Sequence, residues 1–181
     1  FIKKWPTLEK LAKTSEPKIL RFWSGLGYYS RARNLLKAAK IIDKNFNSKI
    51  PDNYEDLISL PGIGDYTARA IMDIGYNQSV MPLDANIERI FARLYAYDQP
   101  LVKIKKQLLE QSQYFLSKKY SSNLIQSFMD YGSLICTPRN PNCSICQIQK
   151  YCLGHEKQIQ NQIPVKLKKQ KTKPIKFTRA Y

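Results

Sequence analysis

The sequence lacks the features that would place the protein in or beyond a membrane. None of its apolar runs approaches the roughly 20 residues of a membrane-spanning helix, and no signal-peptide pattern is present. We therefore expect a cytoplasmic protein with no membrane association. Acidic residues are also scarce, because 14 Asp and Glu stand against 30 Lys and Arg and give a formal net charge of +16. A charge of this size favours a polyanionic partner.

The alternation of polar and apolar residues that is typical of strands is almost absent. Apolar residues recur instead at helical spacing, as they do from Ala32 to Ile42 and from Ile87 to Leu94. We therefore predict an all-α fold. The chain begins with Phe1 rather than methionine, so we expect that residues precede it. Residues 162–181 hold many lysines and no acidic residue, which predicts a basic linker.

A tight turn between two helices is the most informative local feature. Gly62, Ile63 and Gly64 precede apolar residues at helical spacing, so we predict a helix that begins near Gly64 or Asp65. Upstream, Asp52 is predicted to cap a short helix, which makes the unit a helix, a hairpin and a second helix. Unpaired amide groups at such a helix start bind phosphate. A plain glycine-rich connection remains the alternative on these residues alone.

All four cysteines fall within one short loop. They follow the pattern C-x6-C-x2-C-x5-C and are Cys136, Cys143, Cys146 and Cys152. Disulfides are not expected, because no secretory signal accompanies the cysteines. Zinc stays open on residue type, but four thiolates in one loop with a single short pair fit an iron–sulfur cluster better. We expect a structural role for the cluster and a phosphate contact for Arg139, which lies within the loop.

Together these motifs resemble a known family. The Leu-Pro-Gly-x-Gly hairpin, an aspartate about twenty residues further on and the cysteine spacing are similar to those of the helix–hairpin–helix DNA glycosylases of the endonuclease III superfamily. Residues 25–34, with the sequence Gly-Leu-Gly-Tyr-Tyr-Ser-Arg-Ala-Arg-Asn, resemble its adenine DNA glycosylase branch. The similarity extends from residue 1 to about residue 165.

The resemblance implies an architecture of two helical lobes with DNA in the cleft between them. Residues 1–78 would form part of a six-helix barrel lobe with the helix–hairpin–helix unit. Residues 79–161 would form a C-terminal helical lobe with the cluster loop at 136–152. Residues 162–181 would then lead to a further C-terminal domain. The four cysteines match the ligands of a [4Fe-4S] cluster, and the hairpin glycines match a phosphate-binding turn.

The resemblance also implies roles for single residues. Asp84 matches a catalytic aspartate, and Asn86 matches a nearby active-site asparagine. Tyr66 stands where glycosylase-lyases carry the lysine that forms a Schiff base, so no strong lyase step is expected. Tyr28 matches a tyrosine that wedges into the base stack beside the damaged guanine, and Arg31 is a candidate for a phosphate contact.

Base removal explains why a carboxylate is needed at this place. Positive charge builds on the sugar as the C–N bond breaks, and a fixed carboxylate near C1′ stabilises that charge. The target base must first leave the helix stack. An ordinary N-cap role is the alternative for Asp84, and the two roles can coexist.

We therefore expect a monomeric, monofunctional glycosylase of the nucleoid that binds double-stranded DNA carrying a mismatch or an oxidised guanine and removes adenine opposite 8-oxoguanine or guanine. Ala85 stands where adenine glycosylases commonly have glycine, and alanine there also occurs in thymine-mismatch glycosylases. A thymine or uracil mismatch glycosylase is therefore an alternative. The family's general acid is a glutamate on an N-terminal helix, and Glu9 and Glu16 lie in the wrong context for it. A non-catalytic DNA-binding module is the second alternative.

Overall fold

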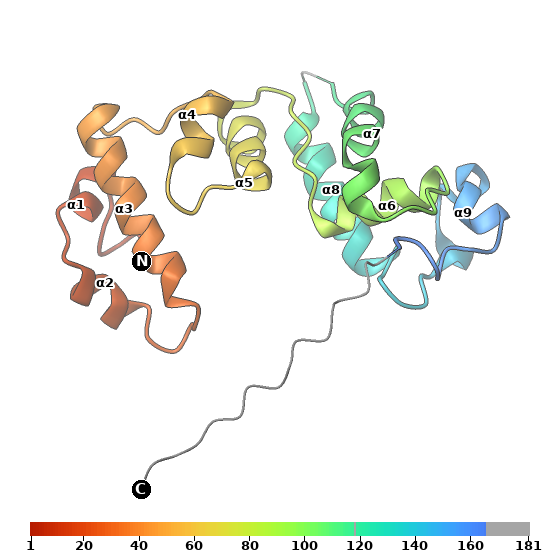
Figure 1. Cartoon of the computed structure of the whole chain (residues 1–181), viewed down its shortest axis with the longest axis horizontal. Coiled ribbons are helices and arrows are strands. Elements are labelled where there is room, and N and C mark those ends of the chain that lie inside the picture. The colour runs from red at the N-terminus through yellow and green to blue at the C-terminus, as the bar shows by residue number, and fades with distance from the viewer. Residues whose placement is uncertain (118, 166–181) are drawn as a thin grey trace, which may run out of the picture.

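The structure is a computed structural model that describes residues 1–117 and 119–165. Its regular structure is helical, and the β-pairing found in this part of the chain is a single parallel bridge between Pro100 and Val165. The all-α prediction is therefore confirmed. Figure 1 shows two groups of helices, one formed by α1 to α5 and the other by α6 to α9. Most of the predicted basic linker, from residue 166 on, lies outside the described residues.

The first group is built on one long helix. α3 (Tyr29–Asn45) packs against α1 (Leu8–Ala12) and α2 (Glu16–Phe22). Its small and aliphatic residues recur every three or four positions, so one face is apolar and is buried against the two shorter helices. The core at this contact comprises Trp5, Leu11, Ala12, Ile19, Ala32, Leu36 and Ala39. This packing places the α2–α3 turn, with the exposed Tyr28, at the N-terminal end of α3.

The helix–hairpin–helix unit packs on the other part of α3. It comprises α4 (Tyr54–Ser59), the hairpin, α5 (Asp65–Ala70) and a π-helical turn, η1 (Ile71–Gly75), that continues α5. Asn53, rather than the predicted Asp52, caps α4, because its side chain accepts a hydrogen bond from the Asp56 amide at 2.9 Å. The shared core comprises Ala38, Ile42, Leu57, Leu60 and Ala68. The hairpin is therefore held rigidly against α3.

The second group surrounds α6 (Ala85–Leu94), which contacts α7 (Leu101–Gln113), α8 (Ser121–Leu134) and α9 (Leu153–Glu156). Phe91 of α6 meets the rings of Phe115 and Phe128 at centroid distances of 5.2 and 5.3 Å. Two 3₁₀ turns, η2 (Cys143–Ile145) and η3 (Gln149–Tyr151), lie in the loop between α8 and α9. No helix in the described part of the chain combines the length and apolarity needed to cross a bilayer.

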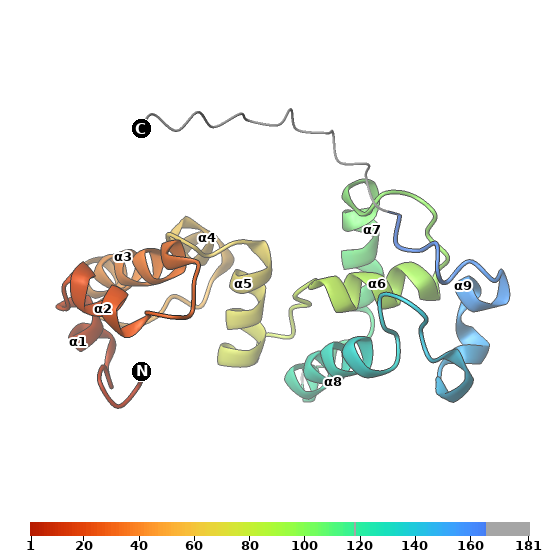
Figure 2. The same ribbon diagram turned by 90° about the horizontal axis from the view of Figure 1, so that it is seen from below.

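The two groups are joined by residues 76–84, which contain the predicted lobe boundary at 78/79. Figure 2 shows α5 between α3 and α4 on one side and α6 and α8 on the other. The π-helical turn that continues α5 contacts α8 directly. The exact division into lobes stays a prediction, but the order of elements brings the hairpin helix and the head of α6 towards the same region of the molecule.

Candidate functional site

The hairpin requires glycine for two separate reasons. Gly62 has a φ of +84°, a conformation that side chains disfavour, and a Cβ built there would lie 2.8 Å from the Cβ of Asn34 in α3. The turn is closed by the Ile63 amide, which donates to the Leu60 carbonyl at 3.1 Å. Gly64 then occupies the N-cap position of α5, where it supplies no side chain to the first amides of the helix. The predicted helix start is confirmed, and the backbone of the hairpin is exposed.

An ion cluster that the sequence did not reveal surrounds the first residue of α5. The Asp65 carboxylate accepts hydrogen bonds from Arg69 Nε at 2.8 Å and from the Tyr54 hydroxyl at 3.0 Å, and it pairs with Lys105 Nζ at 3.1 Å. Burial alone would raise the pKa of Asp65, but the three donors outweigh it and lower the pKa to about 2. The acid beside the exposed amides is therefore ionised and neutralised by cations.

The head of α6 presents the predicted aspartate as an N-cap. Asp84 Oδ1 accepts from the amides of Asn86 at 2.9 Å and Ile87 at 2.7 Å, and Oδ2 accepts from Asn86 Nδ2 at 3.0 Å. The side chain is half-buried, so the carboxylate is both oriented and accessible. The capping hydrogen bonds therefore fix the direction of the carboxylate and leave it partly exposed. The structure thus brings together the two residues predicted as catalytic partners in α6.

Arg89 links this pair to the cysteine loop. Its Nη2 donates to Asn86 Oδ1 at 2.9 Å and to the Gly132 carbonyl at 2.5 Å, while its Nε donates to the Cys136 carbonyl at 2.7 Å. Gly132 of α8 is required here, because a Cβ would lie 2.5 Å from the Cβ of Asn86. The sequence analysis missed both residues, since their partners are more than forty residues apart along the chain.

The remaining predicted residues lie on separate elements. Tyr28 is 81% exposed and adopts a left-handed conformation with φ of +45° immediately before α3. Arg31 follows in the first turn of α3, where its guanidinium lies 5.6 Å from the centre of the Trp23 ring. Tyr66 is 40% exposed in the first turn of α5, and Arg139 is exposed on the cysteine loop. Each of these side chains is therefore available to an external partner.

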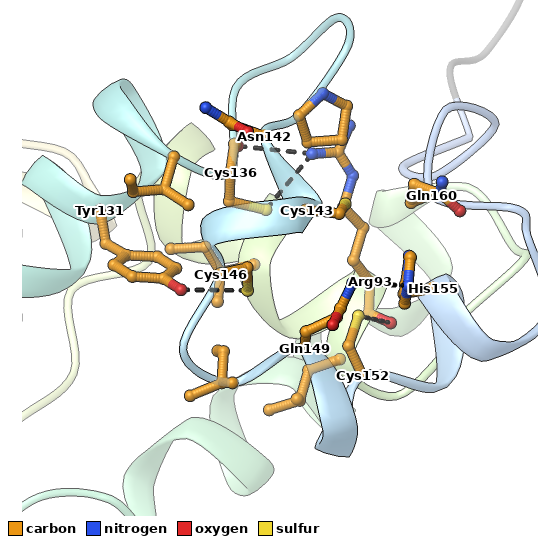
Figure 3. A pocket seen from close by; sticks show the side chains of 15 residues that line it. Arg93, Tyr131, Cys136, Asn142, Cys143, Cys146, Gln149, Cys152, His155 and Gln160 are labelled. Atoms are coloured by element: carbon orange, nitrogen blue, oxygen red, sulfur yellow. Dashed lines mark hydrogen bonds between the residues drawn. The ribbon is translucent and has the colours of Figure 1, made fainter.

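The four cysteines line a single cavity between α6, α8 and the loop that follows α8 (Figure 3). All four are free thiols in this structure. The rest of the lining mixes aliphatic side chains, namely Ile90, Leu94, Ile135 and Ile148, with polar ones, among them Arg93, Tyr131 and His155. Within residues 1–117 and 119–165, two side chains donate to the sulfurs: Arg93 Nη1 to Cys136 Sγ at 3.3 Å and the Tyr131 hydroxyl to Cys146 Sγ at 3.0 Å.

The donor set of the cavity fits an iron–sulfur cluster, because four cysteine thiolates around one cavity are the ligands that such a cluster takes. Burial raises the pKa of the Cys143 thiol, and the neighbouring cysteines raise it further, so four thiolates need a cationic centre among them.

Comparison with known proteins gives the class. Residues 1–114 match the HhH-GPD superfamily base excision DNA repair protein, and residues 136–152 match the iron-sulfur binding domain of endonuclease III. The chain therefore belongs to the HhH-GPD superfamily of base excision DNA repair proteins. The second match begins and ends at the first and last cysteine of the loop and confirms the predicted [4Fe-4S] cofactor. The roles of the individual residues stay predictions.

Within this superfamily, the chain is similar in sequence to proteins named adenine DNA glycosylase. The chain is 39% identical to an adenine DNA glycosylase from Buchnera aphidicola over 86% of its own length and 44% of that protein. It is 33% identical to the human adenine DNA glycosylase over 90% of its length and 30% of that protein. The chain thus spans about half the length of its bacterial relatives, or less.

Solved structures give the same fold. A thermostable thymine-DNA glycosylase superposes with a TM-score of 0.80 at 27% identity. The superposition covers 87% of this chain and 73% of the glycosylase chain. A non-covalent endonuclease III–DNA complex superposes with a TM-score of 0.71 at 21% identity, over 87% of this chain and 73% of its own. The second likeness establishes the fold alone.

Proposed function

We propose that the protein is a monomeric, monofunctional DNA glycosylase that hydrolyses the N-glycosidic bond of adenine mispaired with 8-oxoguanine or guanine in double-stranded DNA. Membership of the HhH-GPD superfamily and the relatives named adenine DNA glycosylase support this function. The observation that carries it is the Asp84 carboxylate, which three hydrogen bonds hold in one orientation at the head of α6.

In the proposed reaction, Asp84 faces the sugar of a nucleotide that has left the base stack. Its carboxylate stabilises the positive charge at C1′, and Asn86 keeps the carboxylate in place through the bond from Nδ2. The hairpin amides hold the backbone beside that nucleotide, and the exposed ring of Tyr28 occupies the stack. Arg31 and Arg139 supply positive charge towards phosphates.

The absence of a lysine at position 66 limits the reaction to hydrolysis. A lysine amine can form a Schiff base with the opened sugar and promote strand cleavage. The phenol of Tyr66 cannot form this bond, so the product is an abasic site in an intact strand.

The departing base must also be protonated. Glu16 forms an exposed ion pair with Arg33 at 2.8 Å, and Glu9 faces solvent with its pKa lowered, chiefly by a hydrogen bond with Thr7. Neither glutamate is therefore placed or tuned to donate a proton to a base near Asp84. The family's general acid is a glutamate of an N-terminal helix, and we assign this role to no residue described here.

A thymine or uracil mismatch glycosylase is the second candidate. Two observations favour it: Ala85 follows Asp84 at the start of α6, and the chain superposes on a thymine-DNA glycosylase with a TM-score of 0.80. Adenine is preferred because the curated relatives, which match this chain at 31–39% identity, carry the name adenine DNA glycosylase.

The test uses the complete gene product that contains this chain and four duplexes: adenine opposite 8-oxoguanine, adenine opposite guanine, thymine opposite guanine and uracil opposite guanine. Release of adenine supports the proposal, release of thymine or uracil replaces it with the second candidate, and binding without release identifies a non-catalytic module. Asp84→Asn should abolish release while duplex affinity stays within about twofold. Asp98→Asn, an exposed aspartate beyond the far end of α6, is the matched control. Turnover retained by Asp84→Asn would remove this residue from the mechanism.

A further inference from the structure

We propose that Tyr131 is a positioning residue for the iron–sulfur centre. Its hydroxyl holds Cys146 through a hydrogen bond to the sulfur and thereby raises the reduction potential of the cluster. The inference concerns this chain's own side chain and does not depend on which base the enzyme removes. The four cysteines are the cluster ligands already predicted, and the role of Tyr131 is what we add.

Geometry places the tyrosine between two of the predicted ligands. Tyr131 lies near the C-terminal end of α8, and its hydroxyl donates to Cys146 Sγ at 3.0 Å, as Figure 3 shows. Its carbonyl accepts from the amides of Ile135 and Cys136, both at 2.9 Å. One residue therefore fixes the backbone of the first cysteine through its main chain and the sulfur of the third cysteine through its side chain.

The environment preserves this bond. The ring is half-buried at the edge of the cavity, beside the aliphatic side chains that line it. A phenol in such a place satisfies its O–H with the partner that is present, and here that partner is a sulfur. Donor contacts that orient a ligand and polarise its sulfur are the usual means by which a protein tunes a metal centre.

The donors are distributed unevenly over the four sulfurs. Cys136 Sγ receives Arg93 Nη1 at 3.3 Å and Cys146 Sγ receives Tyr131. For Cys143 and Cys152, no side-chain donor to the sulfur is found among the described residues. Hydrogen bonds to cluster sulfurs stabilise the state that carries more negative charge, and they raise the reduction potential. Loss of the phenol should therefore shift the potential downwards.

Arg93 cannot serve as the test residue, because it makes several hydrogen bonds besides the one to Cys136 Sγ. Arg93 also donates to the carbonyls of Thr137, Pro138 and Ile163, at 2.7, 3.2 and 3.0 Å, so its loss would disturb the loop itself. In the described part of the chain, the tyrosine hydroxyl donates its hydrogen bond to the sulfur of Cys146. Tyr131→Phe therefore removes the sulfur contact and keeps the ring that packs beside it.

The experiment compares the cluster-loaded complete protein with Tyr131→Phe and with Tyr151→Phe. Tyr151 lies in the same loop, but its ring is 64% exposed, so it is the matched control. We expect a lower midpoint potential by protein-film voltammetry and a several-fold faster loss of the cluster's visible absorbance in chelator for Tyr131→Phe alone. A potential equal to that of the wild type and the control would overturn the proposal, even if cluster loss were faster.

A second variant covers the case in which Tyr131→Phe does not retain its cluster. Incorporation of 3-fluorotyrosine at position 131 keeps the shape of the ring and strengthens the phenol as a donor. The midpoint potential should then rise above that of the wild type, in the direction opposite to Tyr131→Phe. An unchanged or lower potential in the fluorinated protein would overturn the proposal.

Discussion

Asp65 of α5 and Lys105 of α7 form an ion pair at 3.1 Å that connects the hairpin helix to the second group of helices. The pair matters because a carboxylate next to the turn that we propose to bind phosphate would repel DNA if it were not neutralised. Arg69, one turn further along α5, completes the neutralisation at 2.8 Å. The chain thus combines an acid at the first position of α5, which favours the helix, with cations that offset its charge towards an anionic ligand.

Lys105→Ala tests this neutralisation. Removal of the lysine should change the free energy of unfolding by less than about 1 kcal/mol, because the ammonium is half exposed. It should nevertheless weaken duplex binding several-fold at low salt, since the charge of Asp65 is then less balanced. Fluorescence anisotropy on a mismatched duplex measures the affinity. Lys106→Ala is the matched control, because this neighbouring lysine pairs only loosely with Glu110, at 3.9 Å.

A double variant separates this effect from a direct contact. If Lys105 acts by balancing Asp65, then Asp65→Asn should restore most of the affinity that Lys105→Ala loses. An equal loss in the single and the double variant would mean that Lys105 contacts the DNA phosphates itself.

The same carboxylate predicts a dependence of stability on pH. The pKa of Asp65 is lowered from 3.8 to about 2, so the folded state binds its proton less readily than the unfolded state does. Its contribution is therefore present above about pH 4 and is lost as the pH falls through about 2. Denaturant titrations of the wild type and of Asp65→Asn from pH 6 to pH 2 should show the wild-type free energy of unfolding falling more steeply below pH 4. Parallel profiles would contradict the assigned pKa.

Local signals account for what the sequence predicted well. The hairpin depends on Gly62 at its turn and on the apolar repeat that follows, and the head of α6 depends on an aspartate before an amphipathic segment. Each pattern lies within about a dozen residues, so the rules of periodicity and capping can predict the structure from the sequence. The misplaced cap of α4 shows the limit of this reasoning, because Asp52 and Asn53 are both good N-cap residues and only the backbone geometry distinguishes them.

Long-range contacts account for what the sequence could not provide. Arg89 reads as an ordinary helical arginine, yet it is buried and contacts residues 43 and 47 positions away. Lys105 and Tyr131 likewise have partners on other elements. Composition and spacing carry no information on such pairs, since each depends on how α6, α7 and α8 pack.

Tyr66→Lys tests the assignment of the reaction class. Tyr66 lies in the first turn of α5 with its ring partly exposed, and an amine at this place would be able to attack C1′ of the sugar if the site lies where we propose. The variant should form a covalent adduct with a mismatched duplex on borohydride reduction and should cleave the strand. Tyr76→Lys, at the end of η1 and 41% exposed, is the control and should give no adduct. Adducts with both variants, or with neither, would place position 66 outside the active site.

Gly132→Ala tests whether the packing of α8 positions Asp84 and Asn86, the proposed catalytic pair. A Cβ at this position would lie 2.5 Å from the Cβ of Asn86 and 3.2 Å from its Cα, so the head of α6 must move away from α8. We expect a loss of about 1–3 kcal/mol of stability from overpacking. Excision should slow by more than tenfold, because Asn86 carries one of the hydrogen bonds that orient Asp84.

The control for this change is another helical glycine. In Gly75→Ala the new Cβ would have its nearest neighbour at 3.9 Å, an ordinary contact, so stability and excision should stay close to those of the wild type. Single-turnover kinetics and thermal unfolding of the two variants measure both effects. If Gly132→Ala loses stability but excises at the wild-type rate, the contact between α8 and Asn86 only packs the fold. The orientation of Asp84 must then come from its bonds to the amides of α6 alone, since those are the contacts that a shift of Asn86's side chain leaves intact.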